Sequence, residues 1–381
     1  MSRDGARDAF GLYLAVPFCR AKCSYCNFAS GVFPAALQAD YCRALLREID
    51  LTLAALDLAR PPVDTIYWGG GTPTLLAPEQ IAALAAALRE RFAIAPGAEF
   101  TVEAMPGTLP PAVLGALAAA GVNRVSLGVQ SFVEAEARAV GRRQPPAAVL
   151  ADLAHLRAAG IANVNLDLIA GLPRQTPASW RTSLAAAVAA DAPHISIYML
   201  EVDDDSRLGR ELRAGGARYH AAAVPDDDAI AEQYETACAL LARAGYRQYE
   251  ISNFARPGGE SRHNERYWLR RPYLGFGLDA HSFTGSERWG NAGGLDAYLA
   301  ALAAGRLPRR ERCALTPRMA REEALFLGLR RNAGVAAAAF AGFETALAEL
   351  AAAGLLAAQG GRVALTPRGR LLSNEVFARF L

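Results

Sequence analysis

Short apolar runs rich in β-forming residues alternate with longer stretches of helical periodicity from residue 11 to about residue 200. This alternation is typical of βα units, whose strands form a parallel sheet and whose helices cover it. Six runs are predicted to be strands, at residues 12–18, 65–68, 99–103, 124–129, 163–169 and 194–200. The helical stretches span residues 34–59, 78–92, 110–119, 146–159 and 176–190, and several open with proline. We therefore predict an α/β fold, a partial (β/α)6 TIM-like barrel.

Polar residues cluster where the predicted strands end. Cys19, Gly69 to Gly71, Glu103, Gln130 and Asp167 each close or follow one of the six runs. The carboxyl ends of parallel barrel strands form the face on which sites are built. One shared site is therefore expected at this end of the barrel.

The chain is expected to divide into a barrel over residues 1–232, an elaboration over 233–312 and a small domain over 313–381. Residues 201–228, with two runs of aspartate, are expected to be a solvated connection, followed by a helix at 234–244. The elaboration, which contains the motif HNERYW, has weak periodicity and is expected to be a long loop or an extra edge strand.

The last part of the chain has a different pattern, in which helices precede a short hairpin. Helical runs are predicted at 318–332, 335–340 and 343–352, hairpin strands at 355–359 and 362–365, and a closing helix at 366–381. Helices followed by a hairpin indicate a winged-helix-like module. The module lacks a basic face, so we do not expect it to bind DNA.

Charge and the amino terminus exclude several classes of partner. The formal net charge is +2, and no run of Lys or Arg is present, so no nucleic-acid partner is expected. The first 18 residues carry two aspartates before a short apolar stretch, which predicts neither a signal peptide nor a transmembrane segment. We expect a cytoplasmic location.

Three of the six cysteines lie within eight positions, directly after the first predicted strand. Cys19, Cys23 and Cys26 form a CxxxCxxC triplet, whereas the other three stand alone. In a reducing compartment this pattern indicates a metal site rather than disulfides. Three thiolates on one loop can bind three irons of a [4Fe-4S] cluster and leave the fourth iron open for a cofactor. A structural zinc site would need a fourth ligand, and Cys42 lies in a helical pattern away from the loop.

The other polar residues at the carboxyl ends of the predicted strands could bind a ligand next to the cluster. The run Gly70, Gly71 and Thr72 lets the backbone approach a ligand closely, although a tight turn would also explain it. Glu103 could meet an ammonium group and Arg142 a carboxylate, or both could be solvated charges. Asp167 lies in the apolar run NVNLDLI, where a carboxylate without a partner would be costly, so a hydrogen-bonding partner is expected for it. Two further residues have either a binding or a structural role, and these are Tyr13 and Gln130.

The cysteine loop resembles that of the radical S-adenosylmethionine (SAM) superfamily. The segments VPFCRAKCSYCNF, YWGGGTPT, EAMPGTL, RVSLGVQSF and NLDLIAGLP resemble, within it, the HemN/HemW family of coproporphyrinogen-III-oxidase-like proteins, and the similarity extends over nearly the whole chain. The resemblance implies a radical SAM barrel, a [4Fe-4S] cluster with SAM at its open iron, and a HemN-type carboxyl-terminal domain. The SAM contacts that it implies are Tyr13, Tyr25, Gly70, Gly71, Thr72, Glu103, Gln130, Arg142 and Asp167, of which Asp167 suits the ribose hydroxyls.

Two activities occur within such a family. One is an oxygen-independent coproporphyrinogen III oxidase, in which a 5'-deoxyadenosyl radical drives loss of CO2 from two propionates. The other is a HemW-like heme chaperone. The oxidases have a fourth cysteine two positions after the last cluster ligand, where this chain has Phe28, and a longer segment before the cluster loop than the 18 residues here. Both differences favour the chaperone. Whether SAM is cleaved is left open.

Heme, an acceptor protein and an electron donor for the cluster are the partners that this interpretation implies. His263 to Trp268 match the HNxxYW motif of HemW-like proteins. An imidazole is a good axial ligand for heme iron, and aromatic rings suit a flat porphyrin. The heme residues are therefore predicted to be His263, Tyr267 and Trp268, with His281 as the second candidate ligand. If the resemblance to the family is set aside, a lone histidine beside aromatic residues more often has a structural role.

Overall fold

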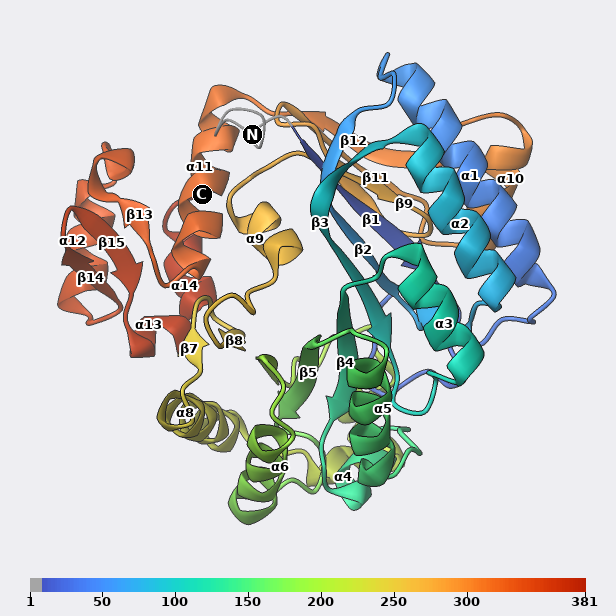
Figure 1. Cartoon of the computed structure of the whole chain (residues 1–381). Coiled ribbons are helices and arrows are strands. Elements are labelled where there is room, and N and C mark those ends of the chain that lie inside the picture. Colours follow the sequence, from blue (N-terminus) through green and yellow to red (C-terminus); the bar gives the residue numbers. More distant parts are fainter. Residues whose placement is uncertain (1–8) are drawn as a thin grey trace.

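The computed structural model describes residues 9–381, which build one mixed, strongly curved sheet with helices outside it (Figure 1). Among the described residues the sheet has the strand order β12-β11-β10-β9-β1-β2-β3-β4-β5-β6-β8-β7. Its centre consists of six parallel strands: β1 (Phe10–Val16), β2 (Pro62–Gly70), β3 (Ala93–Ala104), β4 (Arg124–Gln130), β5 (Asn163–Ala170) and β6 (His194–Met199). The predicted α/β class and the six strands of the partial barrel are confirmed.

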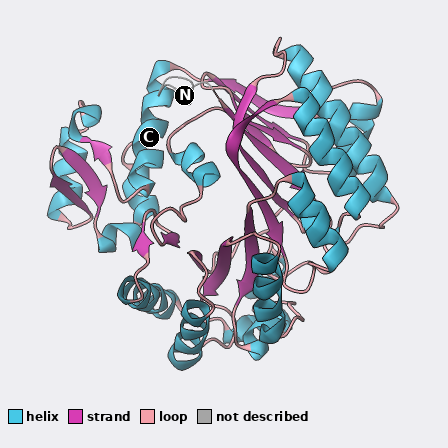
Figure 2. Cartoon of the chain, in the orientation of Figure 1, coloured by secondary structure: helices cyan, strands magenta, loops and turns pink. Residues whose placement is uncertain are grey.

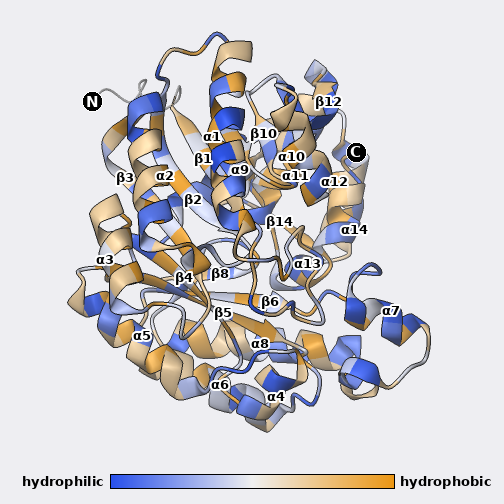
Figure 3. Ribbon diagram, turned by 90° about the vertical axis from the view of Figure 1, so that its right-hand side faces the viewer, coloured by the Kyte–Doolittle hydropathy of each residue, from blue (hydrophilic) through white to orange (hydrophobic). Residues whose placement is uncertain are grey.

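The helices of the βα units lie on the outer side of the curved sheet, as Figure 2 shows. They are α1 (Leu37–Ala55), α2 (Pro78–Arg91), α3 (Pro111–Ala120), α5 (Pro146–Ala158) and α6 (Pro177–Ala189), and a shorter helix, α4 (Glu134–Ala139), precedes α5. Hydrophilic and hydrophobic residues both occur along α1 and α2 (Figure 3), as expected for helices that cover one face of a sheet. The barrel helices agree with the prediction.

The central strands have an apolar outer face and a polar inner face. Successive side chains of a strand point to opposite faces. Leu14, Trp68 and Leu166 are fully buried against the helices. The neighbouring positions on the inner face carry polar groups, such as Tyr67 and Glu103. Since apolar residues usually fill the interior of a barrel, a polar inner face marks the place of a site.

The elaboration extends both edges of the barrel sheet. Beside β1 come β9 (Tyr273–Phe276), which is parallel to β1, and then the antiparallel β10 (His281–Phe283), β11 (Glu287–Asn291) and β12 (Arg309–Ala314). Beside β6 come β8 (Asn253–Ala255) and β7 (Arg247–Gln248). The expectation of a long loop or an extra edge strand was therefore only partly right, because the segment adds several edge strands and, between β8 and β9, a short helix.

That helix, α9 (Arg262–Trp268), carries the HNERYW motif and lies on the inner side of the sheet (Figure 1). Its amino terminus is capped by the Ser261 hydroxyl, which accepts a hydrogen bond from Asn264 N at 3.3 Å. A helix of seven residues makes fewer than two turns, so its period could not be recognised in the sequence.

The predicted solvated connection is only partly irregular. It contains α7 (Arg207–Arg213) and a short 3-10 segment (Arg218–Ala223), and it ends earlier than expected, because α8 (Asp227–Arg243) begins at its aspartates. Asp226 accepts a hydrogen bond from Ala229 N at 2.8 Å and so caps α8, while Asp227 and Asp228 suit the positive end of the helix dipole.

The carboxyl-terminal elements form a module with a hydrophobic core of its own, centred on Leu325, Phe340 and Phe380. After α10 (Leu295–Ala303) and β12, the module consists of α11 (Pro317–Arg330), β13 (Val335–Ala336), a 3-10 turn (Ala337–Phe340), α12 (Glu344–Ala352), β14 (Leu356–Gln359), β15 (Arg362–Leu365), α13 (Pro367–Leu371) and α14 (Ser373–Ala378). The helix expected at 335–340 is instead a strand and a turn, because β13 pairs with β15.

The division at residues 232 and 312 stays a prediction, and the sheet itself runs across both of these boundaries. In the part of the chain that the structure describes, no helix is long and apolar enough to cross a membrane.

Candidate functional site

The cysteine loop leaves the carboxyl end of β1 and is held by backbone hydrogen bonds. Cys19 N donates to Gly31 O at 2.9 Å, and Cys26 N donates to Cys23 O at 3.2 Å. Burial raises the pKa of the Cys19 thiol, while the hydroxyls of Ser30 and Thr72 lower it by offering hydrogen bonds. The other two thiols are near enough for their charges to act on Cys19. The structure therefore brings the predicted triplet together.

The three thiols suit a cluster better than a single ion. Among the described residues, no three His, Cys, Asp or Glu side chains converge closely enough to hold one metal ion. A [4Fe-4S] cluster spreads three thiolates over three irons, so its ligands lie farther apart than those of zinc.

The glycine run at the end of β2 packs directly on this loop. Gly71 N donates to Val16 O at 2.9 Å, and Thr72 N donates to Phe18 O at 2.8 Å. A Cβ on Gly71 would lie 2.6 Å from Val16 O and 2.8 Å from Phe18 O, so only glycine fits. Gly70 has φ +94°, a left-handed conformation that also favours glycine.

Glu103, at the end of β3, lies beside these glycines. It accepts hydrogen bonds from Tyr67 Oη at 2.8 Å and Gly70 N at 3.1 Å. Burial raises the pKa of Glu103 to about 7, with the negative charge of Asp167 adding to the effect and the Tyr67 bond opposing it. Among the described residues, the side chain of Glu103 forms hydrogen bonds but no ion pair. The ammonium group of a ligand could therefore serve as its counter-ion.

Arg142 follows α4 and lies next to the cysteine loop. The proximity of Tyr25 and Cys23 raises the pKa of Arg142 against the effect of burial, which lowers it. Its Nε is buried and has no hydrogen-bond partner in the described structure. An unsatisfied guanidinium nitrogen is costly, and the carboxylate of a ligand would satisfy it.

Gln130 lies next to Arg142, in a strained position at the end of β4. It is buried and has φ +69°, which is uncommon for a residue other than glycine. An ideal Cβ on the neighbouring Gly128 would lie 3.1 Å from Gln130 Nε2 and 3.3 Å from Arg142 Nη2, so Gly128 leaves room for both side chains.

Asp167, on β5, belongs to a polar network of the inner face. Its carboxylate accepts hydrogen bonds from Ser126 Oγ at 3.0 Å and Asn165 Nδ2 at 2.7 Å. The sequence suggested a buried carboxylate, but the side chain is partly accessible, because it faces the inner side and not the helices. Burial still raises its pKa, against the effect of these donors.

These residues fit the two groups that the sequence predicts. The three thiols would hold the cluster, Glu103 and Gly70 would bind the amino group of SAM, Arg142 its carboxylate and Asp167 its ribose. When bound, the cluster and SAM together supply one-electron chemistry, and the side chains orient the cofactor.

The predicted heme residues lie elsewhere, at the amino ends of the strands. His263 is fully buried, with Nδ1 2.9 Å from Thr65 Oγ1 and Nε2 2.8 Å from Tyr267 Oη. Burial lowers the pKa of His263 to about 3, so the ring is neutral. Its ring stacks on Tyr67 at a centroid distance of 5.3 Å, and Trp268 packs on Tyr249 at 6.0 Å. Tyr67 therefore links His263 to Glu103, at the SAM end of the barrel.

His281, the second candidate, is exposed on β10, and its ring has no hydrogen-bond partner among the described residues. It is paired with Gly290 on β11, and a Cβ there would lie 3.0 Å from the imidazole, so the ring packs over the backbone. Of the two candidate ligands, only His281 is accessible in this conformation.

Two residues that hold the predicted site residues in place were not predicted from the sequence, Tyr67 and Glu99. Tyr67 joins Glu103 to His263, and Glu99 accepts hydrogen bonds from Arg262 N at 2.8 Å and His263 N at 3.0 Å, which fixes α9. The available signal was the alternation of polar and apolar residues along β2 and β3, which places both residues on the inner face with Glu103.

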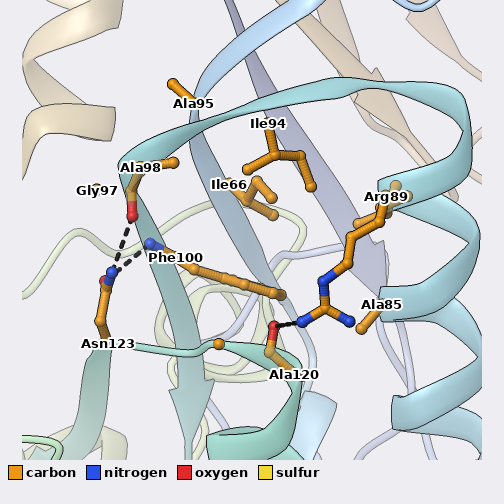
Figure 4. A pocket seen from close by; sticks show the side chains of 12 residues that line it. Ile66, Ala85, Arg89, Ile94, Ala95, Gly97, Ala98, Phe100, Ala120 and Asn123 are labelled. Atoms are coloured by element: carbon orange, nitrogen blue, oxygen red, sulfur yellow. Dashed lines mark hydrogen bonds between the residues drawn. The ribbon is translucent and has the colours of Figure 1, made fainter.

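A separate cavity of about 320 Å³ lies on the helix side of β2 and β3, away from all predicted site residues (Figure 4). Its walls are mainly apolar, and its polar groups bond to the backbone: Arg89 to Ala120 O at 2.6 Å, and Asn123 to Ala98 O at 2.8 Å. Because its polar groups are already satisfied by the chain, we assign it no function.

The fold and the cysteine loop define the class of protein, and comparison with known families agrees. The model of the radical SAM superfamily matches residues 13–187, and that of the HemN C-terminal domain matches residues 315–372. The solved structure of coproporphyrinogen III oxidase (HemN) from Escherichia coli is similar, with a TM-score of 0.85 and 29% identity over 99% of this chain and 91% of that one. Membership of this superfamily implies a [4Fe-4S] cluster and SAM.

Curated relatives narrow the family further. The chain is 39% identical to heme chaperone HemW of Mycobacterium tuberculosis (strain ATCC 25618 / H37Rv), over 98% of this chain and 95% of the relative. It is 36% identical to heme chaperone HemW of Bacillus subtilis (strain 168), over 97% and 98%. The chain belongs to the HemW family of radical SAM proteins.

Proposed function

We propose that this chain is a heme chaperone, which binds heme and transfers it to an acceptor protein. The observation that carries the proposal is similarity along the whole chain. Relatives from Mycobacterium, Bacillus and Lactococcus named heme chaperone HemW match 97% or more of the chain at 34–39% identity. Such full-length similarity includes the elaboration and the carboxyl-terminal module as well as the barrel.

Phe28 supports the chaperone over the oxidase. It stands where the oxidases carry a fourth cysteine, and its side chain is 64% exposed. A phenylalanine cannot supply the thiol that the fourth cysteine of the oxidases provides at this position.

For the axial ligand, the proposal has two versions that differ in what must move. Ligation by His263, with Tyr267 and Trp268 against the porphyrin, requires its Nε2 to exchange the bond to Tyr267 for iron, and α9 to move away from Glu99. Ligation by His281 requires no such change, because the ring is already exposed. Accessibility therefore favours His281 as the first ligand to test, and His263 stays the prediction of the family motif.

An anaerobic heme titration of the reconstituted protein tests the proposal, read by visible absorption. The variants are His263→Ala and His281→Ala, with His155→Ala on the exposed side of α5 as the control. We expect saturation near one heme per chain, an altered spectrum in one of the first two variants, and no change in the control. Absence of saturable binding would overturn the proposal, and turnover of coproporphyrinogen with SAM and a reductant would then indicate the oxidase.

The proposal also includes an electron donor, a heme acceptor and a cellular location. An electron donor is needed for the cluster, and the heme acceptor is a separate protein. We place the chain in the cytoplasm, because a thiolate cluster requires a reducing compartment and all six cysteines are free thiols.

A further inference from the structure

A pocket of about 520 Å³ opens on the outside of the cysteine loop. Three segments that are distant in sequence form it: the loop itself (20–24), the end of α4 with the turn that follows (138–143), and α7 with the 3-10 segment after it (207–220). We call it the basic pocket. It contains none of the residues assigned to SAM or heme.

Five cations line the basic pocket, and none of the described residues in its lining is Asp or Glu. The cations are Arg20, Lys22, Arg138, Arg143 and Arg207. The whole chain has a net charge of only +2, so this is a local concentration of positive charge. Arg138 pairs with Glu134 at 2.6 Å and Lys22 donates to Phe28 O at 2.8 Å, whereas the side chains of Arg20 and Arg143 make no ion pair or hydrogen bond within the described structure.

Only a layer of main chain separates this pocket from a cluster ligand. An ideal Cβ on Gly141, in the pocket wall, would lie 3.7 Å from Lys22 O and 3.8 Å from Cys23 Cα. Ser24, which follows Cys23, is also bound to the pocket wall, because its N donates to Val140 O at 3.2 Å. A molecule in the pocket would therefore lie behind the main chain that carries Cys23.

A second observation indicates that the pocket receives a ligand. The Ser24 side chain, which lines it, is 3% exposed, and its hydroxyl has no hydrogen-bond partner in the described structure. Buried hydroxyls are normally satisfied, so this group lacks a partner that another molecule could supply. Val32, on the pocket rim, is 64% exposed, as is Phe28 near it in the chain, so apolar contact area is also available.

We propose that the basic pocket is the docking site of a small acidic electron-transfer protein, which passes one electron to the cluster. Carboxylates of the donor would pair with Arg20 and Arg143, and apolar side chains of the donor would contact Phe28 and Val32. The reduced cofactor of the donor, such as a flavin hydroquinone, loses one electron and becomes a semiquinone, and the cluster gains that electron. Such redox interfaces are small and steered by charge, which suits a pocket of this size and sign. The inference rests on the cluster and is independent of heme binding.

The test measures reduction of the reconstituted cluster in anaerobic stopped flow, with a reduced acidic flavodoxin-type protein as the probe. The variant Arg20→Glu/Arg143→Glu reverses the two unpaired cations. The matched control, Arg181→Glu/Arg306→Glu, changes the net charge equally at exposed positions outside the pocket. Photoreduced deazaflavin, a small reductant, checks that each cluster remains reducible, and iron content checks that it is intact. Affinity for the oxidised flavoprotein is measured separately by calorimetry.

We expect the pocket variant to lower the second-order rate with the flavoprotein by about tenfold or more at low salt, to flatten its salt dependence and to weaken binding. Rates with deazaflavin and iron content should match the wild type, and the control variant should behave as the wild type with both reductants. Equal slowing by the pocket and control variants would overturn the proposal, because it would show an effect of net charge alone. An unchanged rate with the flavoprotein in the pocket variant would overturn it too.

Discussion

Gly71 illustrates how narrowly a single residue can be specified by its neighbours. Gly71→Ala would place a methyl group 2.6 Å from Val16 O, so either β1 or the cysteine loop must shift. We expect a loss of about 1–3 kcal/mol and a lower iron content after reconstitution. The measurements are the midpoint of anaerobic urea unfolding and the iron and sulfide per chain.

Gly115 provides the matched control for this substitution. It lies in α3, and a Cβ there would meet nothing within 4 Å. Gly115→Ala should stabilise the protein by about 0.5–1 kcal/mol, because alanine is the better helix former. If both variants reconstituted equally well, close packing of Gly71 would not be what the site requires.

Glu103 should make SAM binding depend on pH. Burial raises its pKa to about 7, so at pH 6 most of the molecules carry the neutral acid, which attracts an ammonium group less. We expect the affinity for SAM to fall about tenfold from pH 8 to pH 6. Glu103→Gln should bind SAM about 10–100-fold more weakly at pH 8, and its affinity for SAM should lack the part of the pH dependence that comes from Glu103.

Equilibrium binding to the reconstituted protein at three pH values is the measurement. The titration of SAM itself is common to both proteins, so the difference between them isolates Glu103. Exposed Glu79→Gln, in the first turn of α2, should retain the wild-type profile. A profile of Glu103→Gln parallel to the wild type would show that another group titrates.

At the residue scale, sequence chemistry identified the groups that face a ligand, but not the groups that hold them. Cys19 and Glu103 stand out through spacing and position at strand ends. The roles of Tyr67 and Glu99 depend on partners about 36 and 164 positions away in the chain, and such pairings follow from the register of the strands rather than from local patterns. His263 shows the same limit, since its motif is visible in the sequence but its burial is not.

Among the elements, α1 is joined to β9 and α10 by one buried carboxylate. Glu48 is 2% exposed and accepts hydrogen bonds from Gly277 N at 2.8 Å, Asn291 Nδ2 at 2.5 Å and Tyr298 Oη at 2.6 Å. Burial raises the pKa of Glu48 to about 7, against the effect of these donors. The segment that it holds leads from β9 to His281.

This pKa gives stability a defined dependence on pH. Between about pH 4.5 and 7 the folded protein retains a proton on Glu48 that the unfolded chain has lost, so this contribution to stability falls as pH rises through that range. The change is about 3 kcal/mol in total. Glu48→Gln should remove this share of the slope, whereas Glu79→Gln should not. The measurement is the urea midpoint from pH 5 to pH 8, and an undiminished slope in Glu48→Gln would contradict the assignment.

The elements that were predicted correctly are those with a long apolar face. Helices such as α2 and α5 cover the barrel sheet over more than three turns, so their periodicity is visible in the sequence. The two-residue strands β7 and β13 and the seven-residue α9 are too short for this, and their conformation is set by tertiary contacts. The winged module was predictable because its hairpin turns at two consecutive glycines, 360 and 361, both with positive φ.

Across the whole molecule, the carboxyl-terminal module packs against the segment between β7 and β8. Ile251 of that segment belongs to the hydrophobic core of the module, and Asn332 N donates to Tyr249 O at 3.0 Å. Glu250, fully buried, lies 3.3 Å from Arg330 of α11 and also accepts hydrogen bonds from Ser252 N at 2.7 Å and Asn253 Nδ2 at 2.6 Å. The module therefore covers an acid of the barrel and supplies its only cation among the described residues.

This pair should couple the stability of the module to that of the barrel. Arg330→Ala leaves a buried carboxylate without its cation, which costs about 3 kcal/mol or more, whereas Glu250→Gln removes the charge and should cost less. When Glu250 is already replaced by glutamine, loss of Arg330 leaves no buried charge unpaired and should cost less. We therefore expect a coupling free energy above about 1 kcal/mol from the double-mutant cycle of urea midpoints. The exposed pair Arg379 and Glu349, within the module, is the control and should show less than about 1 kcal/mol. Equal coupling in both pairs would mean that apolar contacts such as that of Ile251, rather than this ion pair, hold the module to the barrel.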